Sequence, residues 1–122
     1  MSVFTIVVTT SPFHGLSATA NELIEAIYAT EEHTINGVFF YQDGVLAANK
    51  LASQPSDEYQ FVEALCQLKT KYNFDLHLCI SAAEKRGMTD DKDNHNIHPA
   101  FTISGLGEMV ELSNSADRVI QL

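Results

Sequence analysis

The chain has 122 residues, of which 45% are hydrophobic, and this size predicts a single domain over residues 1–122 with a core that needs no disulfides. Its 7 basic and 16 acidic side chains give a net charge of −9, which argues against direct nucleic-acid binding because phosphate contacts depend on clustered Lys and Arg. With 2 cysteines and no signal-peptide pattern, the composition favours a reducing, cytoplasmic setting. The apolar run from Val3 to Val8 is too short to span a membrane.

The first part of the chain predicts a strand, a helix and a second strand. The nearly continuous apolar run is typical of a central strand that is covered on both faces. A loop over residues 11–15 leads to a helix, for which Thr19-x-x-Glu22 is a possible cap. The next strand covers residues 34–41 and stops at the turn Asp43-Gly44, and residues 45–51 favour a short helix. The first helix has these apolar residues at helical spacing: Ala20, Leu23, Ile24, Ile27 and Tyr28.

A second long helix follows a start signal at Pro55 and Ser56, and the capping box Asp57-x-x-Gln60 reinforces this start. Cys66 lies beside the apolar face of this helix. We interpret Cys66 as a packing residue, because its neighbourhood offers neither a base nor a helix start that would activate a thiol. The apolar face consists of Phe61, Val62, Leu65, Leu68 and Tyr72.

The third strand brings a cysteine to the point where a helix begins. In the segment DLHLCISAAEKRG, residues 75–87, apolar residues alternate with His77 and Cys79. Ser81-x-x-Glu84 is a capping box, so the sequence predicts a helix from about Ala82. The unpaired N–H groups and the positive dipole end at a helix start stabilise a thiolate, which makes Cys79 a candidate nucleophile. The alternative is that Cys79 is a small buried apolar residue, and the spacing alone favours this alternative.

The last third of the chain continues the alternation of strands and helices. The short helix after Cys79 ends at Lys85-Arg86-Gly87, which is typical of a helix C-terminus. Residues 88–99 are the most polar stretch and predict a mobile loop or lid. A strand over residues 100–104, a turn over 105–107, a helix over 108–114 and a terminal strand over 118–122 follow. The alternation predicts an α/β fold, a three-layer α/β/α sandwich with a five-stranded, mainly parallel sheet.

The strand-to-helix loops of such a sheet meet at one edge, where ligands and chemistry gather. Only one of these loops supplies a strong nucleophile, Cys79. A cysteine hydrolase also needs a base, and His14 is the one histidine expected at this edge. His77 shares the face of Cys79, but we interpret it as an ordinary strand residue. The loops expected at the edge are residues 11–15, 42–44, 79–81 and 104–107.

Several sharper motifs are absent from the sequence. The stretch over residues 11–17 contains no lysine, so it is not a phosphate-binding P-loop, and Val110 stands where a dinucleotide fingerprint needs its third glycine. His95 and His98 lie near acidic residues, but no second ligand pair follows at a defined spacing. We therefore expect a solvated acidic loop and no metal ion.

Six groups of residues are spread over nearly the whole chain. They are Ile6-Val7-Val8-Thr9 with Pro12 and Gly15, Val38-Phe39-Phe40-Tyr41 with Gly44-Val45, Ser56-Asp57-Glu58, Leu78-Cys79-Ile80 with Ala82-Ala83 and Arg86-Gly87, Phe101-Thr102-Ile103-Ser104-Gly105-Leu106-Gly107, and Asp117-Arg118-Val119. Together they resemble the DsrE/TusD family of small sulfur-transfer proteins. In that family the cysteine at the position of Cys79 carries persulfide sulfur, so the resemblance reverses the preference for packing.

The resemblance implies a cysteine-based sulfurtransferase that needs no metal and no organic cofactor. The Cys79 thiolate would take the outer sulfur from a persulfide on a TusA-like donor and pass it to a cysteine of a TusE-like acceptor. The relay would serve the 2-thiolation of the tRNA wobble uridine, with the tRNA bound by another protein. TusB-like and TusC-like subunits would complete a heterohexamer.

The resemblance also leaves supporting roles and alternatives open. Ser81 and the N–H groups from Ala82 onward would stabilise the thiolate or the hydropersulfide anion. Arg86 either adds positive potential or complements a helix C-terminus, and we favour the second role. Ser11 and Gly105 are further supporting candidates from neighbouring loops. The alternatives are a DsrE-type subunit of dissimilatory sulfur oxidation, a non-catalytic interaction subunit, and a flavodoxin-type nucleotide module, which the missing phosphate motifs disfavour.

Overall fold

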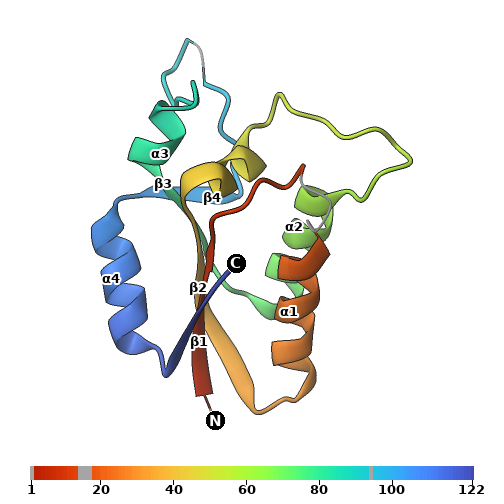
Figure 1. The fold of residues 1–122 in the computed structure, drawn as a ribbon, viewed down its shortest axis with the longest axis vertical. Helices are drawn as coiled ribbons and strands as arrows, with labels where there is room; N and C mark the ends of the chain where they lie inside the picture. Colours follow the sequence, from red (N-terminus) through yellow and green to blue (C-terminus); the bar gives the residue numbers. More distant parts are fainter. Residues whose placement is uncertain (1, 14–17, 94) are drawn as a thin grey trace.

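The computed structural model describes residues 2–13, 18–93 and 95–122. Its five strands form one sheet, in the order β4-β3-β2-β1-β5, and every pair of neighbours is parallel. Helices α1 (Ala18–Ala29) and α2 (Phe61–Tyr72) cover one face of the sheet and α4 (Leu106–Ser115) covers the other (Figure 1). The predicted three-layer α/β/α sandwich is therefore confirmed. The strands are β1 (Ser2–Val8), β2 (His33–Phe40), β3 (Leu76–Cys79), β4 (Phe101–Ser104) and β5 (Arg118–Gln121).

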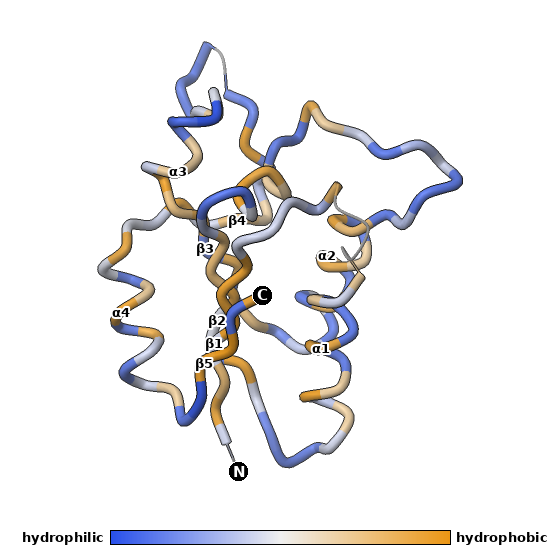
Figure 2. The backbone as a smooth tube through the Cα atoms, in the orientation of Figure 1, coloured by the Kyte–Doolittle hydropathy of each residue, from blue (hydrophilic) through white to orange (hydrophobic). Residues whose placement is uncertain are grey.

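The apolar runs of the sequence became the three central strands. All four residues of β3 are buried, as are the last four residues of both β1 and β2, because helices cover both faces there. The edge strands β4 and β5 are mostly exposed. Figure 2 shows the same division, with apolar residues along the central strands and polar residues on the long loops.

The predicted start of α2 at Pro55 and Ser56 is wrong, because the helix begins only at Phe61. The side chain of Gln60, which was expected to close a capping box, donates instead to the carbonyl oxygens of Pro55 at 2.9 Å and of Glu58 at 3.1 Å. These bonds hold the preceding segment as an irregular loop that extends from the body of the protein (Figure 1). The helix ends at Asn73, whose left-handed conformation (φ 58°) terminates it.

The turn and short helix expected after β2 are one 3-10 helix, η1 (Gln42–Ala48). It starts three residues earlier than predicted because it packs against the end of β1. The amide of Tyr41 donates to the carbonyl of Val8 at 2.9 Å, and a Cβ on Gly44 would lie only 2.0 Å from the same oxygen. A glycine at position 44 is therefore what lets η1 approach β1 this closely.

Both ends of the polar loop over residues 88–99 are attached to the body of the protein. Met88 is buried, and the amide of Thr89 donates to Oδ1 of Asn96 at 2.8 Å. The amide of His98 donates to the carbonyl of Ala48 at 2.6 Å, and Ile97 forms an antiparallel bridge with Asn49. The loop therefore braces η1 rather than forming a lid along its whole length.

The last helix, α4, begins at Leu106, so residues 106 and 107 of the predicted turn belong to the helix. None of the helices in the described part of the chain combines the length and the apolar character that crossing a membrane requires.

Candidate functional site

Cys79 is both the last residue of β3 and the N-cap of helix α3 (Ile80–Glu84). The helix begins two residues before the predicted start at Ala82, and no side chain caps it, so the capping box at Ser81 is wrong. The strand leads directly into the helix because the backbone of Cys79 is extended (φ −70°, ψ 113°). Cys79 therefore directly precedes the first N–H groups of α3, which have no intrahelical acceptors, although its side chain makes no cap hydrogen bond to them.

The Cys79 residue is only 1% exposed and belongs to the core cluster, as the packing alternative predicts. It nevertheless lines a cavity of about 380 Å³ at the carboxyl end of the central strands. The other lining residues are Tyr41, Gln42, Ser81, Ala82, Lys85, Arg86 and Leu106.

Positive charge borders this cavity although the chain as a whole is acidic. Arg86 donates through Nη1 to the carbonyl of Ala82 at 3.0 Å, which is the predicted role of complementing the end of α3. Its Nε and Nη2 also donate to Oδ1 of Asp43, at 3.1 and 2.9 Å. Arg86 therefore joins α3 to η1, and Lys85 lines the same cavity.

The structure brings together three of the five supporting residues that the sequence suggested. Ser81, Ala82 and Arg86 line the cavity of Cys79, and Gly105 is the N-cap of α4, directly before the lining residue Leu106. Ser11 lines a different cavity, of about 20 Å³, because β2 separates β1 from β3. His14 lies outside the described residues.

The sequence did not reveal the surroundings of Cys79 on the neighbouring strand. Cys79 is the register partner of Ser104 on β4. Nδ1 of His77, which is 8% exposed, lies 3.1 Å from Oγ of Ser104. His77, a buried residue of β3, thus forms a part-buried polar pair with Ser104. The shared face of His77 and Cys79 was readable from the period of two, but the register with β4 was not.

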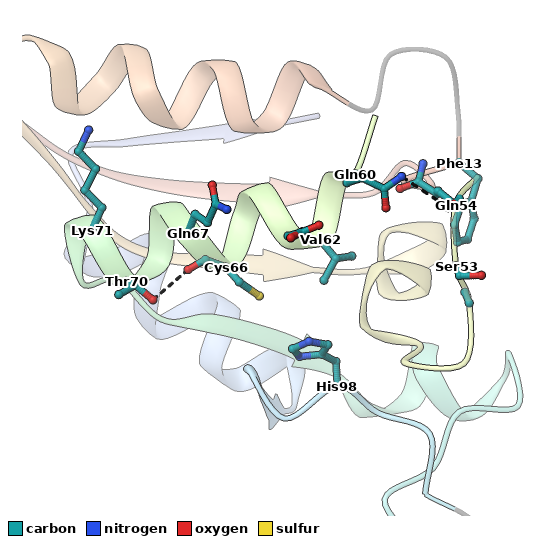
Figure 3. A pocket seen from close by; sticks show the side chains of 12 residues that line it. Phe13, Ser53, Gln54, Gln60, Val62, Cys66, Gln67, Thr70, Lys71 and His98 are labelled. Carbon is teal, nitrogen blue, oxygen red and sulfur yellow. Dashed lines mark hydrogen bonds between the residues drawn. The ribbon is translucent and has the colours of Figure 1, made fainter. Parts of the chain in front are cut away.

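A larger cavity lies elsewhere, along α2, and Cys66 is among the residues that line it (Figure 3). Its volume is about 780 Å³, and Cys66, Val62 and His98 are among its lining residues. Burial raises the pKa of the Cys66 thiol, and nearby Lys69 only partly offsets this effect. Cys66 is half-buried and faces this cavity, so it lies beside the core and not within it.

Within residues 2–13, 18–93 and 95–122, no group of three or more His, Cys, Asp or Glu side chains is placed to hold a metal ion. The ring of His95 instead contacts Nζ of Lys50, with Nδ1 at 2.8 Å.

Known proteins resemble this chain over almost its full length. The model of the DsrE/DsrF-like family matches residues 2–122. Sulfurtransferase TusD of Klebsiella pneumoniae strain 342 is 37% identical over 121 residues, which cover 92% of this chain and 94% of that protein. Sulfurtransferase TusD of a second Klebsiella pneumoniae strain is 36% identical with the same coverage.

Two solved structures share the fold. The ychN protein from E. coli superposes with a TM-score of 0.82 at 22% identity, covering 100% of both chains. A protein of unknown function from Methanobacterium thermoautotrophicum gives a TM-score of 0.68 at 16% identity, covering 98% of this chain and 97% of its own. With a family model matched from residue 2 to residue 122, the chain belongs to the DsrE/DsrF-like family.

Proposed function

We propose that this protein is a sulfurtransferase of the TusD type that carries sulfur as a persulfide on Cys79. One observation carries the proposal: Cys79 is the N-cap residue of α3 and lines a cavity with two of the 7 basic residues of the chain. Both features stabilise a sulfur anion. The TusD sulfurtransferases that resemble the chain support the same activity.

The chemistry is thiol exchange on a persulfide. The Cys79 thiolate attacks the outer sulfur of a donor persulfide, a new S–S bond forms, and the donor leaves as a thiolate. In the second step the thiolate of an acceptor attacks the same outer sulfur, and the electron pair of the broken bond returns to Cys79. The backbone N–H groups of α3, with Lys85 and Arg86, stabilise the anions of both steps.

The burial of Cys79 restricts which donors react. A residue that is 1% exposed does not meet a flat protein surface, so the donor has to insert its persulfide into the cavity of about 380 Å³. A cysteine at the tip of a flexible or extended segment fits this requirement. The same burial protects the bound persulfide from thiols and oxidants in solution, which attack exposed sulfur most readily.

We further propose that the chain works in a sulfur relay for tRNA wobble-uridine 2-thiolation. TusB-like and TusC-like subunits would surround it, a TusA-like protein would donate sulfur and a TusE-like protein would accept it. The net charge of −9 supports a role in which another protein binds the tRNA. A DsrE-type role in sulfur oxidation uses the same site chemistry. A non-catalytic interaction subunit is the second candidate, and the 1% exposure of Cys79 favours it.

A labelling experiment separates these candidates. Wild-type protein, Cys79→Ser and Cys66→Ser are incubated with a donor protein that carries radioactive persulfide sulfur, and circular dichroism verifies that each variant is folded. Label on the wild type and on Cys66→Ser, with none on Cys79→Ser, is the expected result. Equal labelling of Cys79→Ser contradicts the persulfide role, and an unlabelled wild type supports the interaction subunit.

A further inference from the structure

The charges around the Cys79 cavity differ in sign from those on most of the chain. The chain has 16 acidic and 7 basic side chains, but two of the basic ones, Lys85 and Arg86, line this cavity. Among the described residues, no Asp or Glu side chain lines it. A negatively charged group is therefore attracted at the cavity, although the net charge of −9 repels it elsewhere on the chain.

Of these two cations, Lys85 is the one whose charge is available to a ligand. Arg86 is engaged on two sides, since it donates to the carbonyl of Ala82 at 3.0 Å and pairs with Asp43 at 2.9 Å. In the part of the chain that the structure describes, the ammonium of Lys85 forms no salt bridge. Lys85 is exposed and is the C-cap of α3, at the carboxyl end of the sheet (Figure 1). Its flexible four-carbon stem lets the ammonium follow a charged group at the rim of the cavity.

We propose that Lys85 selects sulfur donors in which a carboxylate lies beside the persulfide, such as a cysteine flanked by Glu or Asp on an extended segment. This inference rests on the proposed function of Cys79 and names the chemistry of the donor that the site takes. Because Cys79 is 1% exposed, the persulfide has to enter the cavity. Its entry brings the residues that flank the donor cysteine to the rim, where Lys85 lies.

This role differs from stabilising the sulfur anion. A lysine that stabilises only the anion speeds transfer from every donor by the same factor. A lysine that pairs with a flanking carboxylate separates acidic donors from basic ones, because charge complementarity acts mainly on the choice of partner and on the rate of encounter. An exposed ion pair of this kind changes binding by up to about fivefold, and salt weakens it.

The test uses three persulfidated tripeptides with blocked termini, which carry glutamate, glutamine or lysine on both sides of the cysteine. Mass spectrometry of the intact protein follows the gain of one sulfur atom by Cys79 in a Cys66→Ala background, while each peptide leaves as a thiolate. We expect kcat/KM for the glutamate peptide to exceed that for the lysine peptide about tenfold, mainly through KM. Salt at about 0.5 M should remove most of this preference. The net charge of the chain alone would favour the lysine peptide.

Charge variants at position 85 should change the preference in a defined order. Lys85→Arg retains the charge and should keep the preference, Lys85→Gln should bring the glutamate and lysine peptides within about twofold of each other, and Lys85→Glu should favour the lysine peptide. Lys92→Glu is the matched control, because it changes the net charge as Lys85→Glu does, at an exposed residue that does not line the cavity. It should leave the preference as in the parent protein. Circular dichroism verifies that each variant is folded.

Equal rates for the glutamate and lysine peptides, or a preference that survives Lys85→Glu, overturn the inference. A loss of the same factor for all three peptides in Lys85→Gln also overturns it, because Lys85 would then stabilise the sulfur anion without selecting the donor. Transfer from none of the peptides contradicts the inference as well, since flanking residues alone should be sufficient. The labelling of Cys79 by a loaded donor protein tests the persulfide role separately, so the two failures are distinguishable.

Discussion

Replacing Gly44 by alanine should destabilise the protein strongly, because the added Cβ has no space. The Cβ would lie 2.0 Å from the carbonyl oxygen of Val8 and 2.8 Å from its carbonyl carbon. Both atoms belong to the backbone of β1, a central strand that does not shift easily. Overpacking typically lowers the free energy of unfolding by about 1–3 kcal/mol. Because backbone atoms block the new Cβ here, we expect a loss of about 3 kcal/mol. For a domain of this length that loss lowers Tm by about 12 °C.

Thermal and urea unfolding, both followed by circular dichroism, measure this effect. Gly107→Ala is the matched control, because a Cβ at Gly107 meets no atom within 4 Å and lies in the first turn of α4. Removing a helical glycine stabilises by up to about 1 kcal/mol, so Tm should stay the same or rise. A Tm of Gly44→Ala within about 2 °C of the wild type would refute the argument that η1 needs a glycine against β1.

Three other substitutions test the site and its surroundings. Cys66→Ala should leave sulfur acceptance within about twofold of the wild type in the labelling assay and cost about 1 kcal/mol in urea unfolding, because this half-buried side chain faces a cavity. A tenfold loss of acceptance would contradict the assignment to Cys79. Asp43→Asn should cost less than about 1 kcal/mol in the same unfolding experiment, because its side chain is 64% exposed and water screens its 2.9 Å pair with Arg86. Burial raises the pKa of the Tyr28 hydroxyl above its ordinary 10.0, so this hydroxyl loses its proton in the unfolded chain before it does so in the folded one. The contribution of this group to the free energy of unfolding is therefore complete below about pH 10 and is lost as the pH rises further. Tyr28→Phe should flatten the alkaline decline in urea midpoints, and an unchanged decline would contradict this.

The layers of the fold could be predicted because the central strands are apolar on both faces. The run over residues 3–8 has this property, and the structure places it inside the sheet. The two capping boxes that were expected after Ser56 and at Ser81 both failed. A capping box works only where its first residue is the N-cap, and here the N-caps are Gln60 for α2 and Cys79 for α3.

The sequence predicts where Cys79 lies on its own strand, but it does not predict which residues of other strands surround it. The sequence places Cys79 between a strand and a helix, and the structure confirms that position. Ser11 is a candidate in the sequence because a parallel sheet brings its strand-to-helix loops to one edge. The strand order separates Ser11 from Cys79, and no short-range pattern encodes that order. The sequence does not predict Ser104 as a neighbour, because its register with Cys79 is set across helix α3 and the polar loop that follows it.

The location of the transferred sulfur tests the central claim most directly. The wild-type protein is incubated with a persulfidated donor, its free thiols are blocked and its peptides are mapped by mass spectrometry. The account predicts one additional sulfur atom on the peptide that contains Cys79 and none on the peptide that contains Cys66. Additional sulfur only on the Cys66 peptide, or on neither peptide while the donor remains loaded, would contradict the account.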